Sequence, residues 1–172
     1  VLSKGNRGLY SWVVSACLAA CLVVMSCPPA AFAMQTYTAH GGPVKGLAIA
    51  PDNSAMVSAS FDYTVVVWST DQIAPQATLF GHEAAVNVAA FSPDSALLAA
   101  AGDDGLILLW DMADIAANKD DAEPMILSGH KGKVVGLSFA PDGSQLASAS
   151  WDGSIGLWQR QGNKGPLLAR FI

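Results

Sequence analysis

A polar and aromatic frame repeats three times along this chain with unchanged spacing. In each copy an Asp stands 22 positions after a His, and a Trp stands 6 positions after the Asp. The three histidines of these copies are all the histidines of the 172-residue sequence, in units 42 and 48 residues apart. Such a frame predicts a structural repeat of about 40–45 residues. The copies are His40/Asp62/Trp68, His82/Asp104/Trp110 and His130/Asp152/Trp158.

Local pattern within one unit predicts four short strands. In the first unit an apolar run at 44–50 ends at Pro51 and Asp52, two residues that suit a type I turn. Runs rich in small and β-branched residues follow at 55–60, 64–68 and 76–80. Four strands joined by short turns pair antiparallel, so the sequence predicts an all-β chain of three four-stranded sheets.

These motifs resemble the WD-repeat β-propeller family, whose units carry Gly-His near the start and Trp-Asp near the end. The resemblance covers residues 38 to about 160, with repeats at about 38–70, 80–112 and 128–160. Residues 161–172 are expected to form the outer strand of the third blade. The pattern departs from the family at Ala39, where Gly is usual, and only Trp110 of the three is followed by Asp.

The resemblance implies a buried tetrad in each blade, in which the His, a hydroxyl residue, the Asp and the Trp bond to one another. The hydroxyl position falls on Ser58 and Ser148, whereas the middle unit has Ala100 there. At low dielectric such a network satisfies its own polar groups and fixes strand register. We therefore expect the middle blade to have an incomplete network and to be the weakest of the three.

The same His, Ser and Asp types also make up a hydrolytic triad. A triad needs one reactive Ser beside one His in an exposed cleft. Here the His and the Asp recur in every unit and the Ser in two of the three, a repetition that a structural role requires and catalysis does not. One His per blade cannot converge on a single metal ion either. We expect no catalytic residue, no metal and no cofactor, and hence a protein that is not an enzyme.

Residues 1–33 have the organisation of a secretory signal. Lys4 and Arg7 precede an apolar stretch at 9–25, and the small-x-small sequence at 31–33 predicts cleavage before Met34. The exported bacterial type of this family, in the periplasm or secreted, is therefore the expectation. Two alternatives remain open. The stretch at 9–25 is long enough to stay as a membrane anchor, and the residues ending at Cys21 resemble a lipobox.

The composition of residues 34–172 limits the classes of binding partner that the protein can have. Seven basic residues stand against 14 acidic ones, and all three cysteines lie in the signal segment. A segment without cysteine is compatible with an oxidising compartment. An acidic balance argues against nucleic acid as the partner. We expect protein partners, and no membrane contact beyond the signal segment.

The number of blades predicts an incomplete ring, because propellers close with about four to eight. Residues 35–38 resemble the outer strand that completes the last blade of such a ring. We expect either the N-terminal part of a larger propeller or several copies that assemble into one ring.

The connection between the second and third units is six residues longer than the one before it. Its extra length lies at 113–123, which is acidic but lacks the spacing of a calcium loop. We expect a solvated surface loop.

In this family the usual contact surface combines the loop after each Gly-His with the turn that holds the tetrad Asp. Exposed aromatic side chains at such turns are frequent binding anchors. Packing between neighbouring blades is the alternative for the aromatic ones. Two lysines give the third unit a local basic spot. The candidate partner-binding residues are Phe61, Tyr63, Asp103, Trp151, Lys131 and Lys133.

Two functions remain open on these grounds. The first is a protein-interaction scaffold without catalysis, because no His or Cys is left over for chemistry. The second is the propeller part of a periplasmic redox protein joined to a c-type cytochrome domain, which some exported propellers carry. No Cys-x-x-Cys-His haem motif occurs in the sequence. The first function is the prediction.

Overall fold

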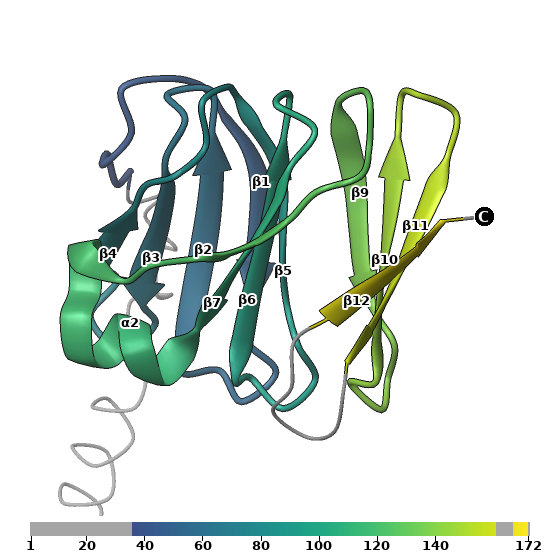
Figure 1. Ribbon diagram of the computed structural model, residues 1–172. Helices are drawn as coiled ribbons and strands as arrows, with labels where there is room; N and C mark the ends of the chain where they lie inside the picture. Colours follow the sequence, from purple (N-terminus) through teal and green to yellow (C-terminus); the bar gives the residue numbers. More distant parts are fainter. Residues whose placement is uncertain (1–35, 161–166, 172) are drawn as a thin grey trace, which may run out of the picture. The chain divides into compact units, whose positions relative to one another are not determined.

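The computed structural model describes residues 36–160 and 167–171, and these form three four-stranded antiparallel sheets (Figure 1). The predicted all-β fold with three four-stranded blades is confirmed. Blade 1 consists of β1 (Val44–Ile49), β2 (Ala55–Ser60), β3 (Val65–Ser69) and β4 (Pro75–Leu79). Blade 2 consists of β5 (Val86–Phe91), β6 (Leu97–Gly102), β7 (Ile107–Asp111) and β8 (Met125–Leu127). Blade 3 consists of β9 (Val134–Phe139), β10 (Gln145–Ser150), β11 (Ile155–Arg160) and β12 (Leu167–Phe171).

Each blade begins with a hairpin whose turn is closed by an aspartate. In blade 1 the Asp52 carboxylate accepts hydrogen bonds from the backbone N–H and the hydroxyl of Ser54, at 2.9 and 2.7 Å. Asp142 holds Ser144 in the same way in blade 3. A side chain that bonds two residues ahead fixes a tight turn, so these aspartates set the register of the first strand pair.

The core lies between successive blades. One face of blade 1 packs on blade 2, and the corresponding face of blade 2 packs on blade 3. The innermost strands β1, β5 and β9 lie side by side (Figure 1). We call the face of each blade that looks toward the next blade its forward face. Its second and third strands supply four buried residues in each of blades 1 and 2, namely Val57, Ala59, Val65 and Val67, and Ala99, Ala101, Ile107 and Leu109.

The forward face of blade 3 is the exception. Its corresponding residues are Ala147, Ala149, Ile155 and Leu157, and Ile155 is 55% exposed where its counterparts in blades 1 and 2 are fully buried. No sheet within the described part of the chain covers this face. The same apolar pattern is therefore buried twice and left open once.

The connection between β7 and β8 was expected to be a solvated loop, and this prediction is wrong. It forms the helix α2 (Met112–Asn118) and the short 3-10 helix η1 (Lys119–Asp121). Asp111 caps α2 by accepting from the backbone N–H of Ala113 at 2.8 Å. Ile115 and Ala122 are buried in the core between blades 1 and 2. The acidic residues of this segment face solvent. Their number in the sequence predicted a fully solvated loop, although a few apolar residues of the segment are buried.

The same connection covers a strand edge. Asp120 Oδ1 accepts a hydrogen bond from the backbone N–H of Thr78, in the outermost strand of blade 1, at 2.6 Å. Unpaired groups on an edge strand can pair with other chains. The longer connection of blade 2 therefore occupies part of the edge of β4.

Of the predictions for the N-terminal residues, one can be compared with the structure and the others cannot. Residues 36–38 lie outside any strand, so the outer strand expected at 35–38 does not form among the described residues. An outer strand needs a sheet to pair with, and all three described sheets already have their four strands. The signal, its cleavage site, the anchor segment and Cys21 lie outside the described residues. In the described ranges, no helix is long and apolar enough to cross a membrane.

Candidate functional site

Blade 1 contains one continuous hydrogen-bonded network. Trp68 Nε1 donates to Ser58 Oγ at 2.8 Å, and this hydroxyl lies 2.7 Å from His40 Nε2. His40 Nδ1 lies 3.0 Å from Asp62 Oδ2, and the same carboxylate oxygen accepts from the backbone N–H of Gly41 at 2.7 Å. The network thus connects a β3 side chain to the loop before β1.

Blade 3 repeats this arrangement. Trp158 Nε1 donates to Ser148 Oγ at 2.9 Å, and Ser148 Oγ lies 2.7 Å from His130 Nε2. His130 Nδ1 lies 3.3 Å from Asp152 Oδ2, which accepts from the backbone N–H of Lys131 at 2.7 Å. The structure therefore brings together all four predicted tetrad residues in blades 1 and 3.

The direction of the hydrogen bonds follows from the donor inventory. A carboxylate only accepts, so the His nitrogen beside it carries the proton. The other ring nitrogen is then an acceptor, to which the Ser hydroxyl donates, while the Ser oxygen accepts from the Trp N–H. A neutral imidazole satisfies every member of the chain.

A fifth member of the network was missed by the sequence reasoning. Thr64 donates its hydroxyl to Asp62 Oδ1 at 2.7 Å and lies 3.1 Å from His40 Nδ1. Ser154 holds the same place beside Asp152, at 2.6 Å. The signal was present in the sequence, because a hydroxyl residue stands two positions after the Asp in the first and third units. The middle unit has Leu106 there.

The middle blade has a different network. His82 Nδ1 lies 2.7 Å from Asp104 Oδ2, but with Ala100 at the hydroxyl position the buried Nε2 of His82 has no partner among the described residues. Trp110 Nε1 donates instead to the backbone carbonyl of Ala122 at 3.2 Å. This carbonyl belongs to the longer connection, which thus supplies the acceptor that blade 2 lacks.

Hydrogen bonds determine the ionisation of the tetrad carboxyls. Burial raises the pKa of Asp62, but the hydrogen bonds from Thr64 and Gly41 outweigh it and hold the pKa well below its usual range. For Asp152 the Ser154 hydroxyl is the main cause of a pKa lowered as strongly. In Asp104 burial opposes the His82 hydrogen bond, and the net pKa is still lowered. All three carboxyls are ionised at neutral pH.

The Ser-His-Asp order within these networks matches that of a hydrolytic triad, yet its environment does not. Ser58 and Ser148 are only 3% and 2% exposed. Each hydroxyl oxygen is also occupied by a Trp N–H. A nucleophile needs access to its substrate. Burial closes these sets to a substrate, and their hydrogen bonds to the backbone hold the loops at one end of each blade.

We call that end the turn face, and it lies at the upper end of the strands in Figure 1. In blade 1 it comprises the turn at 61–63, which holds the tetrad Asp, and the segment at 40–45, which begins at the His. The corresponding segments are 103–105 and 82–87 in blade 2, and 151–153 and 130–135 in blade 3. The candidate aromatic residues are exposed here, Trp151 by 73%, Tyr63 by 51% and Phe61 by 42%. Packing between blades therefore does not cover them.

Lysine side chains accompany two of the aromatic rings. Lys45 Nζ lies 5.3 Å from the centre of the Phe61 ring, and Lys133 Nζ lies 5.7 Å from the centre of the Trp151 ring. Both distances fall within the range of cation–π attraction. Lys131, two positions before Lys133, is also exposed. The sequence reasoning named Lys131 and Lys133 but missed Lys45, since nothing in the pattern placed it over Phe61.

Asp103 links blades 2 and 3 on this face. It forms an ion pair with Lys133 of blade 3 and accepts from Asn87 Nδ2 at 2.8 Å. Asn87 Nδ2 also donates to the backbone carbonyl of Val134 at 3.1 Å. The Lys133 ammonium is the main cause of a lowered pKa of Asp103. Asp103 is therefore held in place by these contacts, so it is not available by itself to bind a partner protein.

Tyr63 has an unfavourable backbone conformation. Its φ of 71° is in the left-handed region, where the two other blades have Gly105 and Gly153 at 77° and 83°. A residue other than Gly costs about 1–3 kcal/mol in such a region. Its presence at an exposed turn, where Gly would fit without strain, favours a role for the ring outside folding.

Comparison with known proteins identifies the family. The family model described as "WD domain, G-beta repeat" matches residues 33–69, 73–111 and 123–159. The chain belongs to the WD-repeat family. No curated protein matches its sequence significantly.

Two solved structures resemble most of this chain. The crystal structure of RRP9 WD40 repeats is 25% identical with a TM-score of 0.69, and the match covers 80% of this chain and 41% of that one. The structure of U3-55K is 25% identical with a TM-score of 0.71, and the match covers 84% of this chain and 43% of that one. This chain thus spans less than half the length of either.

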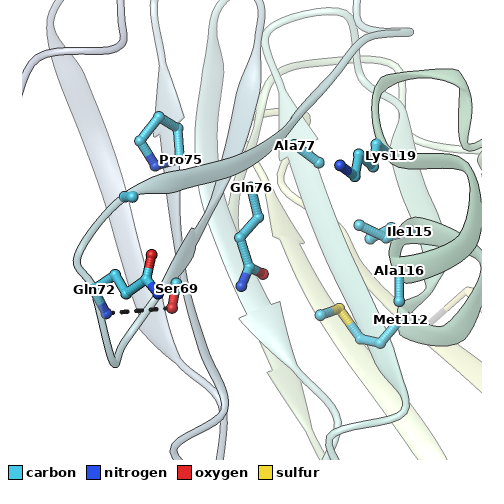
Figure 2. A pocket seen from close by; sticks show the side chains of 10 residues that line it. Ser69, Gln72, Pro75, Gln76, Ala77, Met112, Ile115, Ala116 and Lys119 are labelled. Carbon is cyan, nitrogen blue, oxygen red and sulfur yellow. Dashed lines mark hydrogen bonds between the residues drawn. The ribbon is translucent and has the colours of Figure 1, made fainter.

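This chain also has a pocket of about 490 Å³ at the end opposite the turn face. Figure 2 shows it between the β3–β4 connection, where the Ser69 hydroxyl accepts from the Gln72 backbone N–H, and α2. It shares no residue with the turn face. The described residues contain no group of His, Cys, Asp or Glu that could hold a metal ion. The pocket is lined by Ser69, Gln72, Ala74, Pro75, Gln76, Ala77, Met112, Ile115, Ala116 and Lys119.

We predict that Ser58→Ala lowers the free energy of unfolding by about 2 kcal/mol, because it removes the hydroxyl partner of two buried groups, Trp68 Nε1 and His40 Nε2. Chemical denaturation of the two proteins measures the difference. Ser128→Ala, at an exposed serine, is the matched control and should change stability by less than about 0.5 kcal/mol. Equal effects of the two substitutions would contradict the network.

We also predict that acid destabilises the fold through the tetrad carboxyls. Their pKa values are lower in the folded chain than in the unfolded one, so the stabilisation is present above about pH 4 and is lost as pH falls below it. Melting temperatures followed by circular dichroism between pH 6 and pH 3 should therefore fall. Asp62→Asn should make the fall in melting temperature with decreasing pH less steep. Glu123→Gln, at an exposed site, should have a smaller effect on this slope. An unchanged slope in Asp62→Asn would refute the assignment.

Proposed function

We propose that this chain is a protein-interaction scaffold that holds its partner on the turn face. The observation that carries the proposal is the exposure of Trp151 by 73%, together with Phe61 and Tyr63 at the same end of the sheets. Large exposed aromatic rings are unfavourable in water and are typical anchors of binding interfaces. The tetrads below hold their turns rigidly, which lowers the entropic cost of binding.

The strain at Tyr63 supports this role independently. Tyr63 occupies a left-handed position where the equivalent turns of the two other blades have Gly. A side chain kept against backbone preference is typical of functional sites. Tyr63 is therefore proposed as a direct contact to the partner.

The scaffold is proposed to act as part of a larger ring without catalysis of its own. The support is the open forward face of blade 3, whose four apolar positions are covered in blades 1 and 2 by the next blade. A fourth blade would bury these four positions if it packed on blade 3 in the way that blade 2 packs on blade 1 and blade 3 packs on blade 2. Covering this face would leave the turn face free for a partner.

Export to the periplasm or the medium is proposed as the location, on the strength of the signal-like sequence at 1–33. The purified protein from exporting cells is expected to begin at Met34 by N-terminal sequencing. An intact apolar stretch at 9–25 in the membrane fraction would support the anchor instead. A lipidated N-terminus at Cys21 would support the lipoprotein.

A cross-linking competition tests the interaction role. A photoreactive benzoylphenylalanine replaces Tyr63 in one variant and Ile126, exposed on the outer strand β8, in another. We expect a specific cross-linked adduct between this chain and its partner protein from position 63 alone, because only that position lies on the turn face. An excess of unaltered chain should suppress this adduct, and an excess of Trp151→Ala should suppress it at least about tenfold less effectively. Equal suppression by both chains, or the same adduct from both positions, would reject the proposal.

Tyr63→Gly separates binding from folding. We predict that it raises the free energy of unfolding by about 1 kcal/mol, since relief of backbone strain exceeds the entropy of an added Gly. It should nevertheless compete poorly in the cross-linking assay. Gly153→Ala is the matched control, because its added Cβ meets no atom within 4 Å and its cost is strain alone. A loss of stability in Tyr63→Gly would show that the ring supports the fold.

A further inference from the structure

The innermost strand of blade 1 exposes three apolar side chains on the side that faces away from blade 2. Val44, Leu47 and Ile49 are 48%, 67% and 61% exposed. The innermost strands of the three blades align on the Pro that follows each of them, at 51, 93 and 141. At the same three positions blade 2 has residues that are at most 8% exposed, because they pack on blade 1. These residues are Val86, Ala89 and Phe91.

The forward face of blade 3 has an open hollow of about 320 Å³. Its lining contains small residues, among them Gly136, Ala147 and Ala149, with Ile155 at one side. None of the residues that line it is charged. Burying a charged or unpaired polar group against such a surface is unfavourable, whereas burying an apolar side chain is favourable. The hollow therefore suits an apolar occupant.

Gly136 indicates which part of an occupant would lie against this face. Its counterpart in blade 1 is Gly46, where an added Cβ would lie 3.1 Å from both Asn87 O and Val88 Cα. Gly at this position thus lets the backbone of β5, the innermost strand of the next blade, come into contact. An added Cβ at Gly136 would meet only Ala149 Cβ of its own blade, at 3.4 Å. Blade 3 is therefore open to the same close approach of an innermost strand.

The exposed residues of β1 match in kind the residues that β9 already packs on blade 2. The three aligned positions of β9 are Val134, Leu137 and Phe139, and all three join the core between blades 2 and 3. The strand β1 repeats the Val and the Leu and has Ile in place of Phe. An innermost strand of this composition is thus already seen on one forward face, and β1 can pack on another in the same way.

We propose that two copies of this chain assemble head to tail, with β1 of each copy packed on the forward face of blade 3 of the other. This inference rests on the larger ring proposed above and names a second copy as the part that completes it. Each copy supplies three sheets, so two copies make six, within the range of about four to eight blades in which propellers close. A single copy lies below that range, and three copies exceed it.

The two open faces of one copy differ, so each contact joins unlike surfaces. Contacts of this kind close into a ring when the rotation between copies allows it, and otherwise continue as an open chain of copies. In a ring of two copies the second contact forms between parts that the first contact already holds together, so it strengthens the assembly. The same event covers both exposed apolar surfaces, which would otherwise favour aggregation.

Sedimentation of the full chain in an analytical ultracentrifuge tests the proposal. We expect a particle of two chains. Leu47→Glu and Ile155→Glu each place a carboxylate in the contact and should weaken association at least about 100-fold. A mixture of these two variants should recover a weaker dimer, because an intact Leu47 then meets an intact Ile155 at one of the two contacts. Only a head-to-tail arrangement predicts this recovery.

Ile126→Glu is the matched control, since it makes the same change at an apolar residue that is 58% exposed on the outer strand β8. It should leave the dimer intact. Circular dichroism checks that each variant is folded, and Leu47→Ser and Ile155→Ser replace any that is not.

Three results would overturn the proposal. The first is an unaltered chain that sediments as a monomer, and the second is an assembly larger than two copies. The third is a dimer that Ile155→Glu abolishes and Leu47→Glu does not, because it would show the forward faces of two blades 3 paired with each other. Each of these results would leave the interaction role of the turn face standing, since the cross-linking assay at position 63 tests that role separately.

Discussion

The hydrogen bonds of one carboxylate in each blade organise everything at the turn face. Asp62, Asp104 and Asp152 each bond to the backbone N–H that follows the His and to a backbone N–H two residues ahead in their own turn. Two loops that are far apart in sequence are thereby tied at one point. Because these hydrogen bonds outweigh the effect of burial, the carboxylates stay ionised. The residues before and after each Asp are then presented to solvent in a fixed geometry.

The middle blade shows how such a network can be replaced. It lacks both hydroxyls, with Ala100 and Leu106 in their places, and His82 keeps only the contacts of its Nδ1 side. The tryptophan N–H is too costly to bury without an acceptor, and the Ala122 carbonyl supplies one. The segment that carries Ala122 also buries Ile115 and occupies the backbone N–H of Thr78. One insertion therefore offsets a lost polar network with apolar packing and a covered strand edge.

Different residues explain why some features were readable from the sequence and others were not. The repeat was readable because its members recur at fixed offsets, and the tetrads were readable because those members resemble the WD-repeat pattern. Thr64 and Ser154 carried an equally regular signal that the sequence reasoning did not use. The helix at 112–118 was missed, because it spans only seven residues and buries only Ile115, which leaves no helical period of apolar residues to recognise. Lys45 was missed because its partner Phe61 is 16 positions away and meets it only in the folded blade.

By itself, the sequence determined the repeat and its four-strand unit through spacing and turn chemistry. Its resemblance to the WD-repeat family implied the tetrads, which form in blades 1 and 3. Only the tertiary structure decided which apolar faces are covered, which acceptor the Trp110 N–H uses and which charges on the turn face remain free. Those outcomes depend on contacts between blades, where a side chain's exposure and partners are set by a neighbour that its own unit does not encode. The single exposed forward face of blade 3 expresses this, because its residues match buried ones in kind and differ from them only in having no neighbour within the described chain.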